Sequence, residues 1–317
     1  MCNPEVVYNE WLAFWIKHHK NILEERSYGV TFKELSKSNF KSIELNLPPL
    51  AEQRAIAAAL RAAQAAVQAR RRTIELERER KAALMQALFT RGTRGEPTKL
   101  TEIGEVPQGW EVVQLGSHCE FLQYGTSKFC DTDATGIPVL RIPNVIAGRV
   151  DISDLKYVKL PKKEADGLRL AVGDLIFVRT NGNREYTGRC AMFRGEPSEA
   201  LFASYLIRAR VKTEFFIPEF VQRYTMTAPG RSFLSGRSSN AADGKYNINT
   251  QTIRGVMIPL PPLAEQREIA EALRACDAVI AALEQEAALH EELFRALLEE
   301  LMTGRVRVVS PGALVEP

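Results

Sequence analysis

The stretch LPPLAEQRAIAAALRA, residues 47–62, returns almost unchanged as LPPLAEQREIAEALRA at residues 260–275. The two copies differ only where two alanines of the first copy are glutamates in the second. They align without a gap as far as Arg94 in the first copy and Arg307 in the second. A repeat of this length indicates that the chain is built from two related structural units.

Each copy predicts one long helix. The first is rich in Ala, Leu, Arg and Glu and contains no Gly or Pro between Pro49 and Gly92. A Pro-Pro pair stands near the start of both copies, glycines follow Arg91 in the first, and Gly304 closes the second. We therefore expect helices within residues 47–94 and 260–304, each roughly 60 Å long for about 40 residues.

Apolar residues step by three and four along both helices, which is the spacing of a heptad seam. The predicted seam consists of Ile56, Leu60, Val67, Leu84 and Leu88 in the first helix and Ile269, Leu273, Ile280, Leu297 and Leu301 in the second. Residues 49–94 hold ten Lys and Arg against four Asp and Glu, whereas residues 263–303 hold three against ten. Opposite charge and matched seams predict an antiparallel coiled coil, with two helices that pack elsewhere as the alternative.

Between the helices, short β-rich runs such as IPVLRI and DLIFV alternate with Gly, Pro, Asn and Asp turns. We expect an α+β domain over residues 95–259. Residues 1–46 repeat the end of that domain, because EWLAFWIKHHKNI stands in the place of EFVQRYTMTAPG. Residues 305–317 form a tail in this division. The predicted fold class is α+β, with one globular domain and two long antiparallel spacer helices.

Composition indicates a globular protein of the cytoplasm. The 317 residues are 45% apolar, contain no run long enough for a membrane helix, and do not begin like a signal peptide. The five cysteines are odd in number and form no C-x-x-C pair, which favours free thiols. The net charge of +3 is too small to identify a nucleic-acid binder, because the basic first helix and the acidic second helix offset each other.

Catalytic motifs are missing from the sequence. Neither G-x-x-x-x-G-K-[ST] nor G-x-G-x-x-G occurs, and the four histidines form no H-E-x-x-H pattern. Asp151, Asp154 and Lys156 form a weak likeness to a nuclease trio, but a turn that leads into an edge strand is the simpler interpretation. We expect no metal site and no catalysis by this chain.

Four polar stretches carry the residue types that bind DNA. Lys, Arg, Ser, Thr and Asn hold phosphates, and Arg or Asn also binds base edges. The stretch RTNGNREYTGR is the strongest candidate, and the alternative for every stretch is an ordinary polar turn. The DNA-binding candidates are Tyr124, Thr126, Ser127, Lys128, Arg141, Asn144, Arg179, Thr180, Asn181, Asn183, Arg184, Tyr186, Lys245 and Asn247.

Two copies of LPPLAEQR bracket VPQGWEVVQLGSHCEFLQYGTSK, GIPVLRIPNVIAGRVDISDLKYV and GDLIFVRTNGNREYTGRCAMF. This arrangement resembles the specificity subunit of type I restriction-modification systems over nearly the whole chain. The resemblance implies a non-catalytic subunit whose recognition domains each bind half of a split DNA target. It also implies spacer helices that dock methyltransferase subunits, which recruit the restriction subunit. S-adenosylmethionine, ATP and Mg are then expected only in partner subunits, with no cofactor in this chain.

The chain departs from the family pattern because residues 1–46 match only the end of a first target recognition domain, while residues 95–259 match a complete one. A truncation, a split subunit completed by a second specificity chain, and a homodimer all fit this pattern. Two other functions stay open. One is a coiled-coil adaptor or degenerate fragment without sequence-specific DNA binding, and the other is a stand-alone DNA methyltransferase or nuclease.

Overall fold

The computed structural model describes residues 3–29, 34–240 and 244–308. The chain divides into two compact units, Met1–Glu79 with Asp277–Pro317 and Arg80–Cys276. Residues 309–317 of the predicted tail, 30–33 of the N-terminal segment and 241–243 of a candidate loop lie outside the described residues. Each unit is described by itself below.

Two long helices contribute residues to both units. Helix α4 spans Leu50–Arg91 and helix α10 spans Leu263–Met302. Each begins directly after its Pro-Pro pair, where a missing backbone N–H costs little. Helix α4 ends where Gly92 takes a φ of +67°, and a Cβ at this position would lie 2.6 Å from a carboxylate oxygen of Glu265. Glycine is therefore the residue that this helix end requires.

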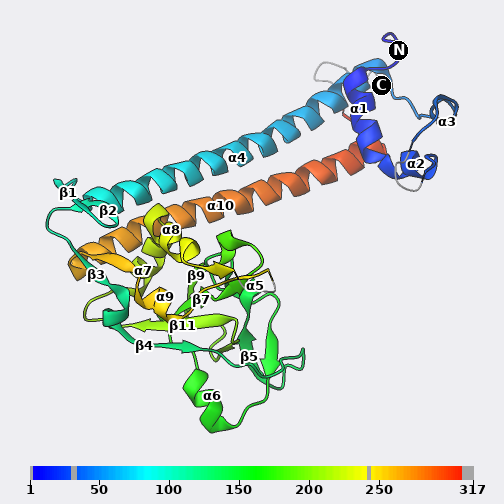
Figure 1. The fold of residues 1–317 in the computed structure, drawn as a ribbon. Helices are drawn as coiled ribbons and strands as arrows, with labels where there is room; N and C mark the ends of the chain where they lie inside the picture. Colours follow the sequence, from blue (N-terminus) through cyan, green and yellow to red (C-terminus); the bar gives the residue numbers. More distant parts are fainter. Residues whose placement is uncertain (1–2, 30–33, 241–243, 309–317) are drawn as a thin grey trace. The chain divides into compact units, whose positions relative to one another are not determined.

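In the unit formed by residues 1–79 and 277–317, α4 and α10 run antiparallel (Figure 1). Their apolar residues form one buried cluster, which includes Ile56, Leu60 and Val67 from α4 and Phe294, Leu298 and Leu301 from α10. Among the predicted seam positions here, Leu297 is half-buried within this cluster and Ile280 is half-buried. The fold class predicted from the sequence, an α+β domain with two long antiparallel helices, is confirmed.

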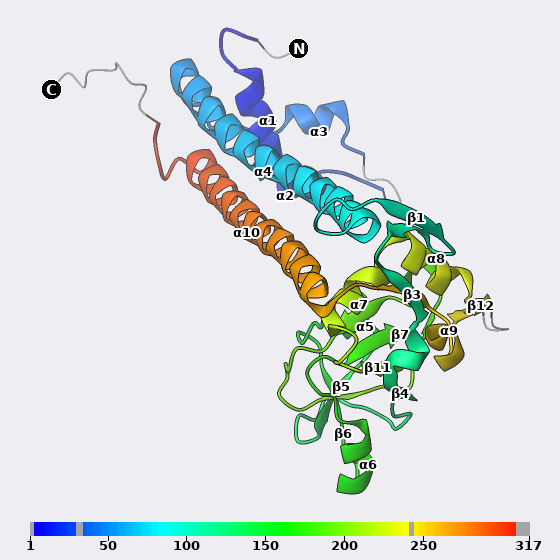
Figure 2. The ribbon, with the colours of Figure 1, turned by 90° about the vertical axis from the view of Figure 1, so that its left-hand side faces the viewer.

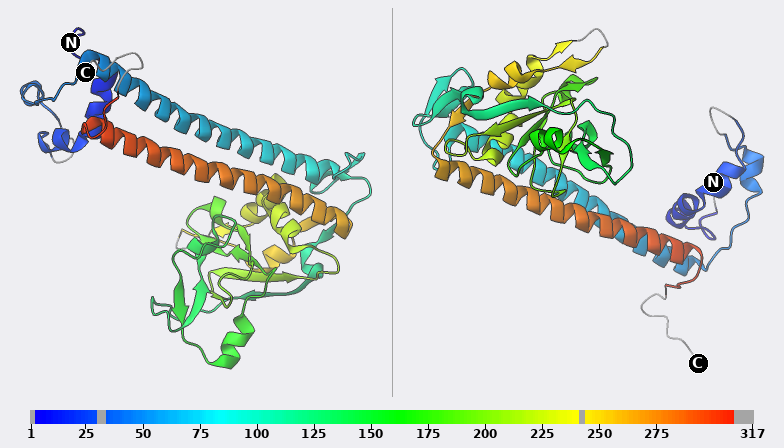
Figure 3. Two further views of the ribbon diagram at one scale, coloured as in Figure 1. Left: turned by 180° about the vertical axis from the view of Figure 1, so that it is seen from behind. Right: turned by 90° about the horizontal axis from the view of Figure 1, so that it is seen from below.

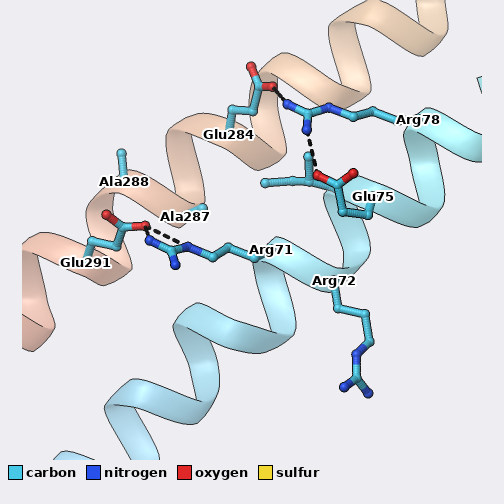
Figure 4. Close-up of a pocket in the computed structure, with 9 residues that line it drawn as sticks. Arg71, Arg72, Glu75, Arg78, Glu284, Ala287, Ala288 and Glu291 are labelled. Atoms are coloured by element: carbon cyan, nitrogen blue, oxygen red, sulfur yellow. Dashed lines mark hydrogen bonds and ion pairs between the residues drawn. The ribbon is translucent and has the colours of Figure 1, made fainter.

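Ion pairs cross the middle of this helix pair (Figure 4). Arg71 Nη2 lies 2.6 Å from Glu291 Oε1, and Arg78 Nη2 lies 2.7 Å from Glu284 Oε1. The repeat aligns Arg71 with Glu284 and Arg78 with Glu291, so the pairs cross over as antiparallel packing demands. An open groove of about 580 Å³ lies between these side chains. Exposed pairs stabilise little, at about 0–1 kcal/mol each, but they disfavour a parallel arrangement.

The N-terminal segment packs against the helix pair of its own unit (Figure 3). It forms α1 (Asn9–His18), α2 (Lys20–Glu25) and α3 (Lys37–Lys41). Trp11 and Trp15 of α1 are 2% and 7% exposed and join the apolar cluster. His18 Nε2 lies 2.8 Å from Glu299 Oε2 of α10. The tryptophans thus bury their rings where α1 crosses the long helices.

Two buried glutamines at equivalent positions of the repeat form equivalent sets of hydrogen bonds. Gln53 accepts from the Tyr8 amide and donates to the carbonyls of Val6 and Pro48. Gln266 accepts from the Ile217 amide and donates to the carbonyls of Phe215 and Pro261. Both glutamines are 0% exposed. The residues before α1 and before α7 (Pro218–Thr225) therefore occupy equivalent positions.

Replacing either glutamine with alanine is expected to lower the free energy of unfolding by about 1–3 kcal/mol, because buried amide and carbonyl groups lose their partners. Urea denaturation of Gln53→Ala and Gln266→Ala, followed by circular dichroism, measures this effect. Gln64→Ala, at a half-buried position of the same helix, serves as the control. Equal stability of Gln53→Ala and Gln64→Ala would contradict the prediction.

The unit Arg80–Cys276 contains several small sheets (Figure 2). Strands β4, β11, β7 and β9 form one sheet in that order, and β10, β5 and β6 form another. Helix α6 lies at the end of this unit away from α7 and β3 in two views (Figures 1 and 2). The strands are β1 (Thr98–Thr101), β2 (Gly104–Pro107), β3 (Glu111–Gln114), β4 (Cys119–Tyr124), β5 (Ile137–Leu140), β6 (Lys156–Val158), β7 (Leu175–Val178), β8 (Thr180–Asn181), β9 (Cys190–Met192), β10 (Leu201–Phe202), β11 (Leu206–Val211), β12 (Ser239–Asn240), β13 (Tyr246–Asn247) and β14 (Met257–Leu260). The other helices are α5 (Ile142–Val145), α6 (Lys162–Leu168), α8 (Ala228–Gly236) and α9 (Thr250–Arg254), with 3-10 turns η1 (Leu115–His118) and η2 (Arg184–Tyr186).

Two apolar clusters stabilise this unit. The first joins the end of α4 and the start of α10 to α7, and Phe89 lies 5.1 Å from Phe220 between ring centroids. The predicted seam residues Leu88, Ile269 and Leu273 belong to it, with Leu84 packed against it. The second cluster fills the space around β5, β7 and β10. The α+β domain is therefore attached to its own segments of both long helices.

A buried carboxylate on α7 collects three arginines. Glu219, whose side chain is 4% exposed, accepts from Arg194 at 2.9 Å, from Arg223 at 3.2 Å and from Arg274 of α10. Burial tends to raise the pKa of Glu219, but hydrogen bonds from Arg274 and Arg194 outweigh it and lower the pKa below 4.5. The carboxylate thus stabilises the contact of α7 with α10 in its ionised form.

Stability is expected to depend on pH through Glu219. Because its folded pKa is lowered, its contribution is complete above the unfolded pKa near 4.5 and is lost as pH falls through the folded pKa. As pH falls from about 6 to about 3, the unfolding temperature should decline less for Glu219→Gln than for the wild type. Glu214→Gln, an exposed position of the same loop and helix region, should follow the wild type. Parallel curves for Glu219→Gln and the wild type would exclude this role.

Candidate nucleic-acid interface

A small antiparallel sheet brings together two candidate loops that are about sixty residues apart. Strand β13 pairs with β8 on one side and with β12 on the other. Asn247 lies opposite Thr180, and Tyr246 lies opposite Asn181. The stretch RTNGNREYTGR and the stretch that ends in GKYN therefore form one surface, which their separation in sequence could not show.

A third candidate stretch joins this surface through Tyr124. The Tyr124 hydroxyl accepts from the Thr250 amide at 3.3 Å, and the Arg179 guanidinium lies 4.9 Å from the centroid of the Tyr124 ring. Arg179 Nη1 also donates to the Ser204 carbonyl at 3.1 Å. Tyr124 is 39% exposed, so its ring and the arginine present a joint planar surface.

The 3-10 turn η2 and the residues that follow it present two more arginines beside aromatic rings. The Arg189 guanidinium lies 4.5 Å from the Tyr186 ring centroid, and that of Arg184 lies 6.0 Å from the Tyr246 ring centroid. Arg184 donates to the carbonyls of Ser235 and Gly236 at the end of α8, at 2.9 and 3.0 Å. Arg189 donates to the carbonyls of Glu185 and Ile146, so both side chains are held in place before any ligand arrives.

Arg231 of α8 completes the surface, and sequence reasoning missed it. Its Nη2 donates to the carbonyls of Glu185 and Thr187, which holds η2 in place. Its Nη1 is buried and, within the described residues, has no hydrogen-bond partner. Burial lowers the pKa of Arg231, and the positive charge of Arg189 adds to the effect. Both arginines line a pocket of about 280 Å³.

We call Arg179, Arg184, Arg189 and Arg231 the arginine patch. In the part of the chain that the structure describes, none of the four forms an ion pair with a carboxylate within 4 Å. Their hydrogen bonds go to backbone carbonyls, and the Glu185 carboxylate, which acts on Arg231 from beyond ion-pair distance, offsets only part of the four positive charges. Elsewhere in the same unit, Arg194, Arg210 and Arg274 pair with buried carboxylates. The patch therefore has the electrostatic character of an anion-binding surface.

Three of the DNA-binding candidates are buried. Asn144 is 2% exposed, and it accepts from the Arg141 amide and donates to the carbonyls of Asp151 and Asp154. Thr126 and Thr180 are 6% and 8% exposed. Polar side chains that satisfy a turn inside the domain offer little to a ligand. All three side chains are buried in this structure, so they present little polar surface to DNA.

Other candidates keep accessible polar atoms with defined positions. Asn181 and Asn183 accept from amides two residues ahead, at 2.8 and 2.9 Å, and so form the turns that their residue type favours. Arg141 forms an ion pair with Asp154 at 2.8 Å, so its charge is less available to bind a phosphate. Ser127, Lys128 and Lys245 are exposed, and Phe129 beside Lys128 is 85% exposed.

No local pattern in the sequence could have identified Arg231, because its contacts with η2 arise only from tertiary packing.

Two further kinds of site were sought among the described residues, a metal centre and a membrane span. Over residues 3–29, 34–240 and 244–308, no three His, Cys, Asp or Glu side chains gather as metal ligands would. No helix in that part of the chain combines the length and apolarity needed to cross a membrane. Burial raises the pKa of the Cys119 thiol to about 11, which makes it unreactive near neutral pH.

Comparison with protein families gives one clear match. The model of a family described as "Type I restriction modification DNA specificity domain" matches residues 3–83 and 107–292. Two relatives are the type I restriction enzyme EcoKI specificity subunit of Escherichia coli and the putative type I restriction enzyme MjaX specificity subunit of Methanocaldococcus jannaschii. The first is 27% identical over 84% of this chain and 58% of its own length. The second is 28% identical over 66% of this chain and 49% of its own length.

The chain thus spans about half the length of these two relatives. Among solved structures, the S subunit of a type I restriction-modification system from M. genitalium has a TM-score of 0.59 at 14% identity. That similarity covers 94% of this chain and 74% of the other. At such low identity it shows a shared fold.

Proposed function

The chain belongs to the type I restriction modification DNA specificity domain family, as its sequence predicted, and we propose that it is a non-catalytic subunit that recognises a specific sequence in double-stranded DNA. One observation carries this proposal. Three arginines without an ion-paired carboxylate in the described residues lie beside Tyr124, Tyr186 and Tyr246, and Arg231 holds the backbone of the same loop. DNA offers what this surface lacks, which is a regular series of negative charges.

The proposed mechanism is positioning. Arginines of the patch bind phosphates or guanine edges, and the half-exposed or exposed amides of Asn181 and Asn183 suit adenine edges. Backbone carbonyls already orient the guanidinium groups, so binding orders few side chains. The domain would then recognise one half of a split target.

We propose methyltransferase subunits as partners, with the restriction subunit joining through the complex. Helices of 42 and 40 residues, at about 1.5 Å per residue, are long enough to span one to two turns of B-DNA at about 34 Å each. They would set the distance between half-sites. S-adenosylmethionine, ATP and Mg would bind in the partner subunits, where the chemistry takes place.

Selection from random DNA duplexes tests this function. The chain is purified with its methyltransferase subunit, the mass of the complex is measured under native conditions, and bound duplexes are sequenced. Enrichment of a defined motif is expected. A split, nearly palindromic motif with two specificity chains per complex would indicate a homodimer, and one short motif with one chain would indicate a single half-site. Absence of any motif would favour a coiled-coil adaptor, and activity of the chain alone would favour an enzyme.

A further inference from the structure

The two copies of the repeat differ in the pairing of the segment that precedes the long helix. In the second copy, β14 (Met257–Leu260) pairs antiparallel with β3 (Glu111–Gln114) just before the Pro-Pro pair of α10. The repeat places residues 44–47 at the position of β14. Among the described residues, the backbone groups of 44–47 have no backbone hydrogen-bond partner. Within residues 3–29 and 34–308, apart from 241–243, the first copy therefore has an unpaired segment where the second has a paired strand.

This open segment already has the side-chain arrangement of a strand. Val256 and Ile258 are both 0% exposed on the inner side of the second copy. Their equivalents, Ile43 and Leu45, are partly buried against the apolar cluster around α1. The alternation leaves the equivalent of Met257, Glu44, exposed. A partner strand could therefore pair with this segment while Ile43 and Leu45 keep facing the apolar cluster.

A tryptophan accompanies the partner strand in the second copy. Trp110 immediately precedes β3, is 1% exposed, and donates from Nε1 to Glu265 at 3.0 Å. The equivalent of Glu265 is Glu52, which instead accepts from Arg307 at 3.1 and 2.8 Å. The Arg307 side chain is 71% exposed, so little packing holds it there. An exposed arginine thus occupies the position that a buried indole fills in the other copy.

We propose that residues 43–47 accept an antiparallel β-strand from a segment outside residues 1–317, and that a tryptophan preceding this strand replaces Arg307 at Glu52. The donor has the chemistry of the segment Trp110–Gln114, an indole followed by a short alternating strand. A second folded copy of this chain is a poor donor, because its own Trp110 and β3 are buried and paired. The inference rests on the repeat and not on DNA binding.

A peptide with the sequence of residues 107–116, PQGWEVVQLG, is the probe. Fluorescently labelled, it should bind the full chain saturably, and it should slow amide hydrogen exchange at residues 44–47. A peptide with phenylalanine in place of tryptophan should bind about tenfold more weakly, because it lacks the hydrogen bond to a carboxylate. The Glu52→Gln variant should reduce the preference for the tryptophan peptide. Failure to bind, or binding without slower exchange at 44–47, overturns the proposal.

Two proline variants provide a matched pair. The Leu115 amide donates to the Val256 carbonyl, so the backbone groups of Val256 face β3. In an antiparallel pair, every second residue faces the partner strand in this way. Leu260 therefore points its N–H toward β3, whereas Pro259 faces away from it. Leu47 and Asn46 are their equivalents. Leu47→Pro should weaken peptide binding about tenfold or more, whereas Asn46→Pro should leave it nearly unchanged. Equal binding by both variants overturns the proposal, and thermal unfolding of each verifies that the chain is folded.

Discussion

Replacing Asp174 with asparagine is expected to lower the free energy of unfolding by about 3–5 kcal/mol. Asp174 is 0% exposed and accepts from Arg210 Nε and Nη2 at 2.7 and 2.8 Å. Its Oδ2 also lies 3.7 Å from Arg208 Nη1, and the Arg208 side chain is 4% exposed. Asparagine would leave a buried guanidinium without its counter-charge, which costs far more than an exposed pair contributes.

Urea denaturation monitored by circular dichroism measures this change. The control is Asp166→Asn, which removes a carboxylate 2.9 Å from Arg169 where both side chains are partly exposed. It should cost less than about 1 kcal/mol. Similar losses for the two variants would show that burial does not decide the contribution of these pairs. Burial also lowers the pKa of Arg208, consistent with a guanidinium that needs Asp174.

The double variant Arg184→Gln/Arg189→Gln is expected to reduce affinity for the selected duplex about a hundredfold or more. Both guanidinium groups lie beside aromatic rings and have no carboxylate partner within the described residues. For each arginine that binds a phosphate, its replacement should also reduce the slope of log affinity against log salt by about 0.9. Fluorescence anisotropy at several salt concentrations gives both quantities.

The matched control removes two lysines of α6. Lys162 and Lys163 are exposed, and α6 lies away from α7 and β3 (Figure 2). Lys162→Gln/Lys163→Gln makes the same change in charge and should retain affinity within a few fold. If both double variants lose affinity equally, general charge and not the arginine patch governs binding. An unfolding temperature equal to that of the wild type would show that Arg184→Gln/Arg189→Gln is folded.

Much of the architecture could be predicted because its signals are local. The apolar steps along residues 47–94 and 260–304, the Pro-Pro pairs and the charge difference predicted two antiparallel helices. Sequence reasoning also identified the stretch around Arg179 and Arg184, because Gly, Asn and Arg cluster there. It did not identify Arg231, which lies in a helix whose residue pattern resembles any other amphipathic turn.

The sequence by itself determined the repeat, the helix pair and the family, since these depend on which residue types recur at which spacing. Only the tertiary structure decided which polar residues are accessible. Thr126 and Asn144 carry the same polar groups as exposed residues, yet the fold buries them in turns, while Arg189 and Arg231 line one pocket. The physical reason is that burial and the pairing of charges depend on residues distant in sequence, and no local pattern records them.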